Sequence, residues 1–170
     1  MSKFDEIRQA YLEARKSFFA QRDASAAFAL DLVKGMERYL DGPPYLIHFL
    51  TNTRQATAAA SHDAKDAAVY GNDGLWHFSL GMELVGDKEG LHKNAARQSL
   101  AFELLVKPEG TGFSAGLKGW DDRFALPASG DSPERTRLCD FWFQRIIDSY
   151  LQPGHRFFED MADSDRTVRG

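Results

Sequence analysis

The sequence predicts an α+β domain in which helices at both ends of the chain pack on one face of an antiparallel sheet. Apolar residues recur at helical spacing over residues 2–40 and again after residue 132. Between them, the chain alternates apolar and polar residues with the period of a half-buried strand. Strands in one run with helices at the ends are typical of α+β folds. Since a sheet covered on both faces would read as continuously apolar, the alternation predicts one open face.

A long helical segment is predicted over residues 2–40. Its apolar residues follow steps of three and four, namely Phe4, Ile7, Tyr11, Ala14, Phe18, Ala29, Leu32, Met36 and Tyr39. The sequence Asp41-Gly42-Pro43-Pro44 ends it, because glycine favours helix C-termini and proline cannot continue a helix. A straight helix of this length would measure about 60 Å. Because a domain of this size is more compact, we expect a break near Asp23, with Asp23 or Ser25 capping the second half.

Residues 45–68 fit two assignments. The run from Tyr45 to Leu50 is short and apolar, which is typical of either a buried strand or a helical turn. The alanine-rich stretch Thr53–Ala60 is compatible with a helix. Periodicity alone leaves both assignments open.

A meander of three to five antiparallel strands is predicted in the middle of the chain. Asn72-Asp73-Gly74 is typical of a hairpin turn, and clear alternation follows from Leu75 to Val85. A polar loop over residues 86–96 leads to a second alternating stretch over residues 99–106. The turn Lys107-Pro108-Glu109-Gly110 then leads to a third strand, and residues 67–70 supply a further one.

A C-terminal helix is predicted from Ser132-Pro133-Glu134, with the serine as cap and the proline in the first helical position. Its buried stripe consists of Leu138, Phe141, Trp142, Ile146 and Tyr150. Pro153-Gly154 ends this helix, and a short helical piece follows over residues 156–161. We expect a single domain over residues 1–161 and a flexible tail over residues 162–170.

Composition narrows the classes of function. The formal net charge is −4 and no region of the chain is strongly basic, so we expect no binding to nucleic acid. The sequence has no apolar run of about 18 residues and no signal peptide, so we expect no membrane association and a cytoplasmic location. The single cysteine, Cys139, cannot form an internal disulfide, which is compatible with a reducing compartment.

One catalytic pattern is present, since Gly112-Phe113-Ser114-Ala115-Gly116 matches the G-x-S-x-G sequence of serine-hydrolase nucleophiles. That pattern requires a sharp turn at the serine and a helix directly after it. Here a hairpin turn precedes the serine and a glycine-rich segment follows. We therefore interpret Ser114 as a strand residue and the glycines as sites of a twist, a bulge or a close approach. We assign no catalytic residue, and the missing context of this pattern favours a protein that is not an enzyme.

The histidines give no indication of a metal site. They are His48, His62, His77, His92 and His155. No two of them lie three or four residues apart, which is the spacing that helical metal sites use. We expect neither a metal nor a cofactor.

Two surfaces are candidates for binding. The first is the polar face of the sheet, where His77 and Glu83 project from one strand and Glu103 from the next. A carboxylate near His77 would shift the pKa of either group. The second is the loop Trp120-Asp121-Asp122-Arg123, where an aromatic residue is flanked by charges on a connection. The simpler interpretations are a solvated sheet face and a Trp120 that closes the end of the core.

We therefore expect a non-catalytic protein that binds a protein partner through the sheet face and the Trp120 loop. In size, mild acidity and element order the chain resembles small toxin-immunity proteins and acidic secretion chaperones. No motif matches, so the resemblance assigns no residue a role. The alternative is a small enzyme or small-molecule-binding domain with a pocket near His77, Glu83 and Glu103. The aromatic N-terminal helix would also suit a homodimer.

Overall fold

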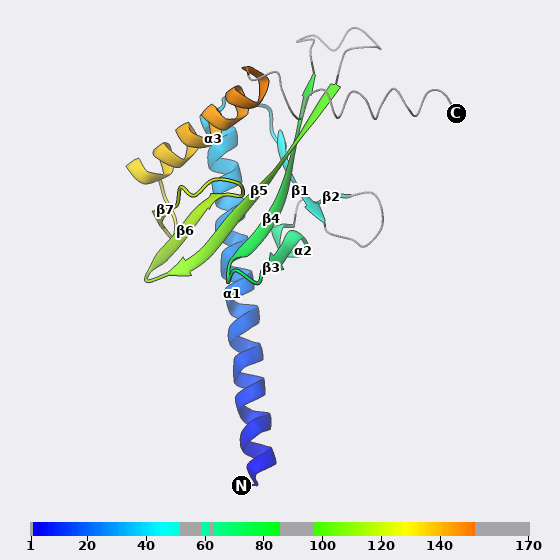
Figure 1. Ribbon diagram of the computed structural model, residues 1–170, viewed down its shortest axis with the longest axis vertical. Helices are drawn as coiled ribbons and strands as arrows, with labels where there is room; N and C mark the ends of the chain where they lie inside the picture. The colour runs from blue at the N-terminus through cyan, green and yellow to red at the C-terminus, as the bar shows by residue number, and fades with distance from the viewer. Residues whose placement is uncertain (1, 52–58, 62, 86–96, 152–170) are drawn as a thin grey trace, which may run out of the picture.

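A computed structural model of the chain describes residues 2–51, 59–61, 63–85 and 97–151. Its elements are α1 (Lys3–Tyr39), β1 (Ile47–Thr51), β2 (Ala59–Ser61), α2 (Ala64–Ala67), β3 (Ala68–Tyr70), β4 (Trp76–Val85), β5 (Arg97–Glu109), β6 (Gly112–Leu117), β7 (Phe124–Pro127) and α3 (Pro133–Leu151) (Figure 1). The expected α+β architecture is confirmed. The loop expected over residues 86–96 and everything expected after residue 151 lie outside the described residues.

The strands of the described chain form one antiparallel sheet in the order β2-β1-β4-β5-β6-β7, with β3 also paired to β4. A continuous register joins β4 to β5, from Trp76 opposite Val106 to Val85 opposite Arg97. The short apolar run that fitted two assignments is the strand β1. β1 and β2 extend the expected meander on one side, and β7 extends it on the other.

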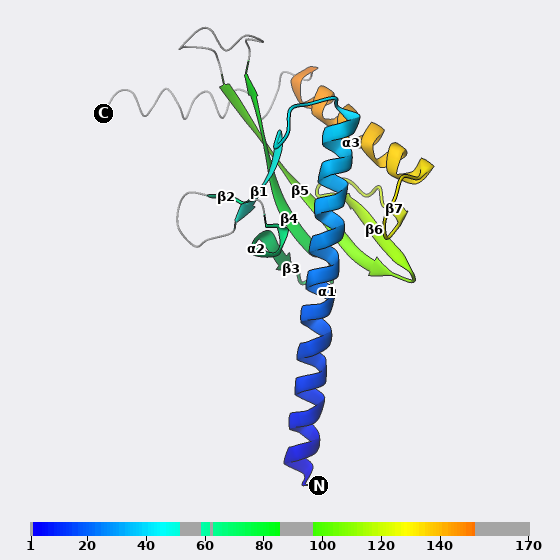
Figure 2. The ribbon, with the colours of Figure 1, turned by 180° about the vertical axis from the view of Figure 1, so that it is seen from behind.

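Helices cover one face of this sheet. Figure 1 shows the sheet in front of α1, and Figure 2, seen from behind, shows α1 in front of the sheet. The covered face carries the apolar half of each alternating strand. Fully buried core residues are Phe49, Trp76, Phe78, Leu80, Leu104, Val106 and Leu117 from the sheet, and Ala29, Met36, Leu138 and Trp142 from the helices. Burial of each large side chain contributes about 1.5–3 kcal/mol.

α1 is one continuous helix, so the predicted break near Asp23 is wrong. The helix begins with a capping box, in which the Ser2 hydroxyl accepts from the Asp5 N–H and the Asp5 carboxylate accepts from the Ser2 N–H. No glycine or proline interrupts it before Gly35. Asp23 stays within the helix, and Ser25 is buried against the core instead of serving as a cap.

The first part of α1 extends away from the domain. We call residues 3–17 the arm; both views show this segment projecting beyond the sheet (Figures 1 and 2). Every side chain of residues 6–21 is exposed, whereas much of the helix from Ser25 onward is buried. The argument from compactness failed because only the second half of the helix belongs to the packed domain. At about 1.5 Å per residue, the arm is about 22 Å long.

α3 begins as predicted, with the Ser132 hydroxyl accepting from the Arg135 N–H at 3.1 Å. The buried Arg135 side chain forms an ion pair with Asp31 of α1 and lies over the Phe28 ring. Charge therefore ties α3 to α1 in addition to apolar contact. Cys139 lies half-buried on α3, and burial raises the pKa of its thiol to about 11.

Two glycines of β6 allow neighbouring atoms to approach closely. A Cβ on Gly112 would lie 2.2 Å from the carbonyl oxygen of Leu126 in β7, and one on Gly116 would lie 2.4 Å from Nη1 of Arg123. The close-approach interpretation of these glycines is confirmed. Ser114 lies between them in extended strand, paired on both sides, and so lacks the sharp turn of a nucleophile elbow.

We expect Gly112→Ala to lower the free energy of unfolding by about 1–3 kcal/mol, because the new Cβ would overlap a backbone carbonyl and push β6 from β7. Gly35→Ala in α1 is the matched control. A Cβ there meets only Arg38 Nη2, at 3.9 Å, and alanine favours a helix over glycine by about 1 kcal/mol. Urea denaturation measures both variants. Equal effects of the same sign would contradict this explanation.

Candidate functional site

The face of the sheet opposite the helices, which no described element covers, collects the polar half of β4 and β5, and we call it the uncovered face. Residues that alternate with the core positions of β4 face away from the helices, and they include His77 and Ser79. Ser79 is the register partner of Glu103, and Gly81 is the partner of Ala101. Small side chains therefore lie at the centre of this face.

Four charged side chains form a continuous row on this face, which we call the charge row: Asp73, His77, Glu103 and Lys118. His77 Nε2 donates to both carboxylate oxygens of Asp73 at 3.0 Å, and its Nδ1 donates to Glu103 Oε1. Glu103 Oε2 accepts from Lys118 Nζ at 2.8 Å. The row thus connects the β3–β4 turn, β4, β5 and the residue after β6.

The charge row favours a charged imidazole. Carboxylate oxygens only accept hydrogen bonds, so two ring nitrogens that both face carboxylates must each carry a proton. Burial of His77 acts to lower its pKa, but hydrogen bonds and charges from Asp73 and Glu103 outweigh burial and raise it. Burial acts to raise the pKa of Glu103, yet its bonds from Lys118 and His77 lower it. The hydrogen bond from His77 also lowers the pKa of Asp73.

The hairpin turn positions the charge row. Asp73 Oδ1 accepts from the Leu75 N–H at 3.0 Å, a side-chain bond typical of aspartate in turns. Gly74 has a φ of 77°, which glycine adopts without steric cost. A Cβ on Gly71 would lie 2.4 Å from His77 Nε2, so a glycine there leaves room for the imidazole. The local sequence therefore fixes both ends of the Asp73–His77 bond.

Glu83 lies towards the other end of the uncovered face. Its register partner is Ser99, whereas the partner of His77 is Leu105. Six residues along a strand correspond to about 20 Å. The structure therefore brings His77 and Glu103 together and leaves Glu83 apart from them.

The Trp120 loop presents charges while its aromatic ring packs inward. The Trp120 ring is half-buried and meets the Phe141 ring of α3 edge to face, with centroids 6.4 Å apart. The three charged residues that follow it are exposed, namely Asp121, Asp122 and Arg123. Arg123 Nη1 donates to the carbonyl oxygens of Trp120 and Asp122, each at 3.1 Å. The loop is therefore held by its own arginine, and Trp120 closes this end of the core.

Sequence reasoning missed Asp73 and Lys118 as members of the charge row. A signal for Asp73 is its place in a hairpin turn four residues before His77. A signal for Lys118 is its position in the outward alternation that begins with Ser114 and Gly116. Sequence reasoning also did not place His48 at a binding surface. The imidazole of His48 lies over Gly81, where an added Cβ would be 2.6 Å from Nε2 of His48.

The arm carries a second candidate surface, which is apolar. The side chains of Phe4, Ile7 and Tyr11 are 70%, 69% and 59% exposed. At the base of the arm, the Phe18 ring lies 5.7 Å from the Tyr70 ring and 5.0 Å from the Trp76 ring, measured between centroids. The apolar stripe therefore continues from solvent into the core.

No group of three or more His, Cys, Asp or Glu side chains within the described ranges is arranged to hold a metal. In the same part of the chain, no helix combines the length and apolar character that crossing a membrane requires. Comparison with known protein families, with curated proteins and with solved structures finds no match for this chain. Function must therefore be inferred from the geometry itself.

We expect His77→Gln to lower the free energy of unfolding by about 2 kcal/mol at about pH 5.5 and by less at about pH 9. Because its pKa is raised, His77 stabilises the fold fully below its ordinary value of 6.5, and this contribution is lost as pH rises through the folded-state pKa. The carboxylates of Glu103 and Asp73 set the lower end of the pH range in which the charge row stabilises the fold. Their contributions are present above the ordinary values of 4.5 for Glu103 and 3.8 for Asp73, and are lost as pH falls through the lowered values.

Urea denaturation of wild type and variant across this pH range gives the difference in stability. Ser79→Ala is the control, since it changes the same strand and the same face without removing a titrating group. Its effect should not vary with pH. A His77→Gln effect as large at about pH 9 as at about pH 5.5 would contradict a charged imidazole in the charge row.

Proposed function

We propose that this protein is a non-catalytic, cytoplasmic protein-binding module whose principal binding surface is the arm. The observation that carries the proposal is the exposed stripe of Phe4, Ile7 and Tyr11 on a helix that projects from the domain. Contiguous exposed apolar surface is typical of interaction sites, and aromatic residues are enriched at interface centres. The half-buried free thiol of Cys139 is compatible with a reducing compartment.

A partner would also stabilise the arm. An isolated helix of about 15 residues is marginal in water. The arm is sustained by the Ser2 cap at its start and by its continuation into the packed half of α1. A partner that covered the stripe would add about 1.5–3 kcal/mol for each large side chain fully buried, before the costs of association.

The charge row supports binding over acid–base catalysis. Carboxylates engage both ring nitrogens of His77, which leaves neither free to exchange a proton with a substrate. Glu83 lies about 20 Å from His77 along β4. A small enzyme or ligand-binding domain that uses His77, Glu83 and Glu103 is therefore the less supported alternative.

The uncovered sheet face is a second surface in this proposal. The charge row on this face holds charges of both signs in fixed positions, and Ala101 is exposed at the centre of the face. Preorganised charges favour specificity in protein recognition. Trp120 would contribute little, because its ring packs on Phe141. The Trp120 loop would offer a partner its charged groups instead.

Affinity capture from the native cells, followed by mass spectrometry, would compare wild type with Tyr11→Glu and Ala101→Arg. We expect Tyr11→Glu to lose a stoichiometric partner, because a carboxylate would replace an aromatic anchor in the stripe. Ala101→Arg should retain that partner. Ala27→Arg is the control, since Ala27 is exposed on the packed half of α1, away from both surfaces.

Circular dichroism and thermal melting would verify that each variant folds. A partner retained by Tyr11→Glu and lost by Ala101→Arg would assign binding to the sheet face. If the wild type held no protein through a salt wash, the proposed binding role would be wrong.

A further inference from the structure

We infer that the partner of the arm is an amphipathic helix of another protein whose apolar face is flanked by a line of carboxylates. This inference rests on the proposed binding role and adds the chemistry of the partner. Its basis is the position of Arg8 and Arg15 relative to the apolar stripe.

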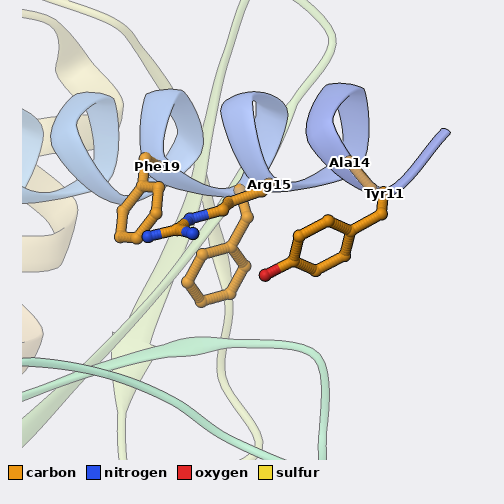
Figure 3. Close-up of a pocket in the computed structure, with 5 residues that line it drawn as sticks. Tyr11, Ala14, Arg15 and Phe19 are labelled. Atoms are coloured by element: carbon orange, nitrogen blue, oxygen red, sulfur yellow. The ribbon is translucent and has the colours of Figure 1, made fainter. Parts of the chain in front are cut away.

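Arg8 and Arg15 directly follow Ile7 and Ala14 in the sequence, so they lie along one edge of the stripe of the arm. Seven residues are nearly two helical turns, so the two guanidinium groups share one side of α1, with Tyr11 between them. Figure 3 shows Tyr11 and Arg15 projecting from the same side of the helix, together with Phe19. An open hollow on this side is lined by Tyr11, Ala14, Arg15, Phe18 and Phe19. A partner helix that covered the aromatic rings would therefore bring one of its flanks beside the two arginines.

Among the described residues, these two arginines have no partner of opposite charge. No ion pair involving Arg8 or Arg15 is present in the part of the chain that the structure describes. The Arg15 guanidinium lies over the Phe19 ring, 5.5 Å from its centroid. Arg22, one heptad further along, is already paired with Asp23. Because side chains that flank a packed helical seam pair by charge across it, a fitting partner brings carboxylates to these two guanidinium groups.

A second copy of the chain does not meet this requirement. In a parallel pair, a flanking residue faces the residue five positions earlier in the other copy, which places Arg8 opposite Lys3. Two antiparallel arms centred between Tyr11 and Leu12 would place Arg8 opposite Arg15 of the other copy. In either orientation like charges meet beside the stripe, which disfavours the homodimer that the aromatic helix suggested.

The spacing of the stripe favours a helix as the partner. Its positions 4, 7, 11, 14 and 18 alternate steps of three and four, which is the pattern by which two helices pack along a seam. An extended polyanion fits less well. Residues 3–17 contain four basic and three acidic side chains, a net charge of only +1. A net charge of this size attracts nucleic acid or an anionic membrane weakly, although the two arginines beside the stripe match carboxylates locally.

Two synthetic helical peptides with the same apolar face would test this inference, one with glutamates along one edge of that face and the other with lysines there. Isothermal titration calorimetry with the full chain should show the acidic peptide binding at least about tenfold tighter, and less tightly in high salt. The double variant Arg8→Glu/Arg15→Glu should reverse the preference. Arg15→Glu should weaken binding of the acidic peptide about tenfold. The neighbouring Lys16→Glu should not, because Lys16 points to another side of the helix.

Equal affinity for the two peptides, or binding of neither, would overturn the inference of an acidic partner. So would a preference for anionic phosphatidylserine vesicles over the acidic peptide. A wild-type dimer in sedimentation equilibrium that Tyr11→Glu dissociates would assign the stripe to a second copy instead. The proposed binding role itself fails only if affinity capture finds no partner, so the two failures are distinguishable.

Discussion

The packing of the second half of α1 against the sheet is the contact on which the rest of the structure depends. It buries Ala29 and Met36 in the same core as Phe78 and Leu80, which decides which face of the sheet is covered. It provides, through Asp31, the carboxylate that anchors α3. It also supplies the helical turns from which the arm continues into solvent, because a helix as short as the arm would be marginal alone.

The two candidate surfaces meet at one hairpin. Tyr70 and Trp76, on either side of the β3–β4 turn, contact Phe18 at the base of the arm. The same turn and the start of β4 provide Asp73 and His77 of the charge row. A displacement of this hairpin would therefore alter the apolar surface and the polar surface together.

The sequence pattern was sufficient for the parts of the structure that depend on local periodicity. Alternation along β4 and β5 predicted the open face and placed His77 and Glu103 on it. Periodicity could not decide how much of the first helix belongs to the domain, and so the break near Asp23 was expected where none exists. The remaining features depend on three-dimensional placement. Lys118 reaches Glu103 only through the register of β5 and β6, and the direction of the Trp120 ring depends on where α3 docks.

The environment of Cys139 has a practical consequence for studying this protein in solution. With a pKa of about 11, only about one thiol in ten thousand is ionised at neutral pH. Because the thiolate is the reactive form, alkylating reagents and peroxides should modify this residue slowly in the folded state. A cysteine introduced on the exposed arm would react far faster. The chain can thus carry a single fluorophore or spin label on the arm while its native cysteine stays in place.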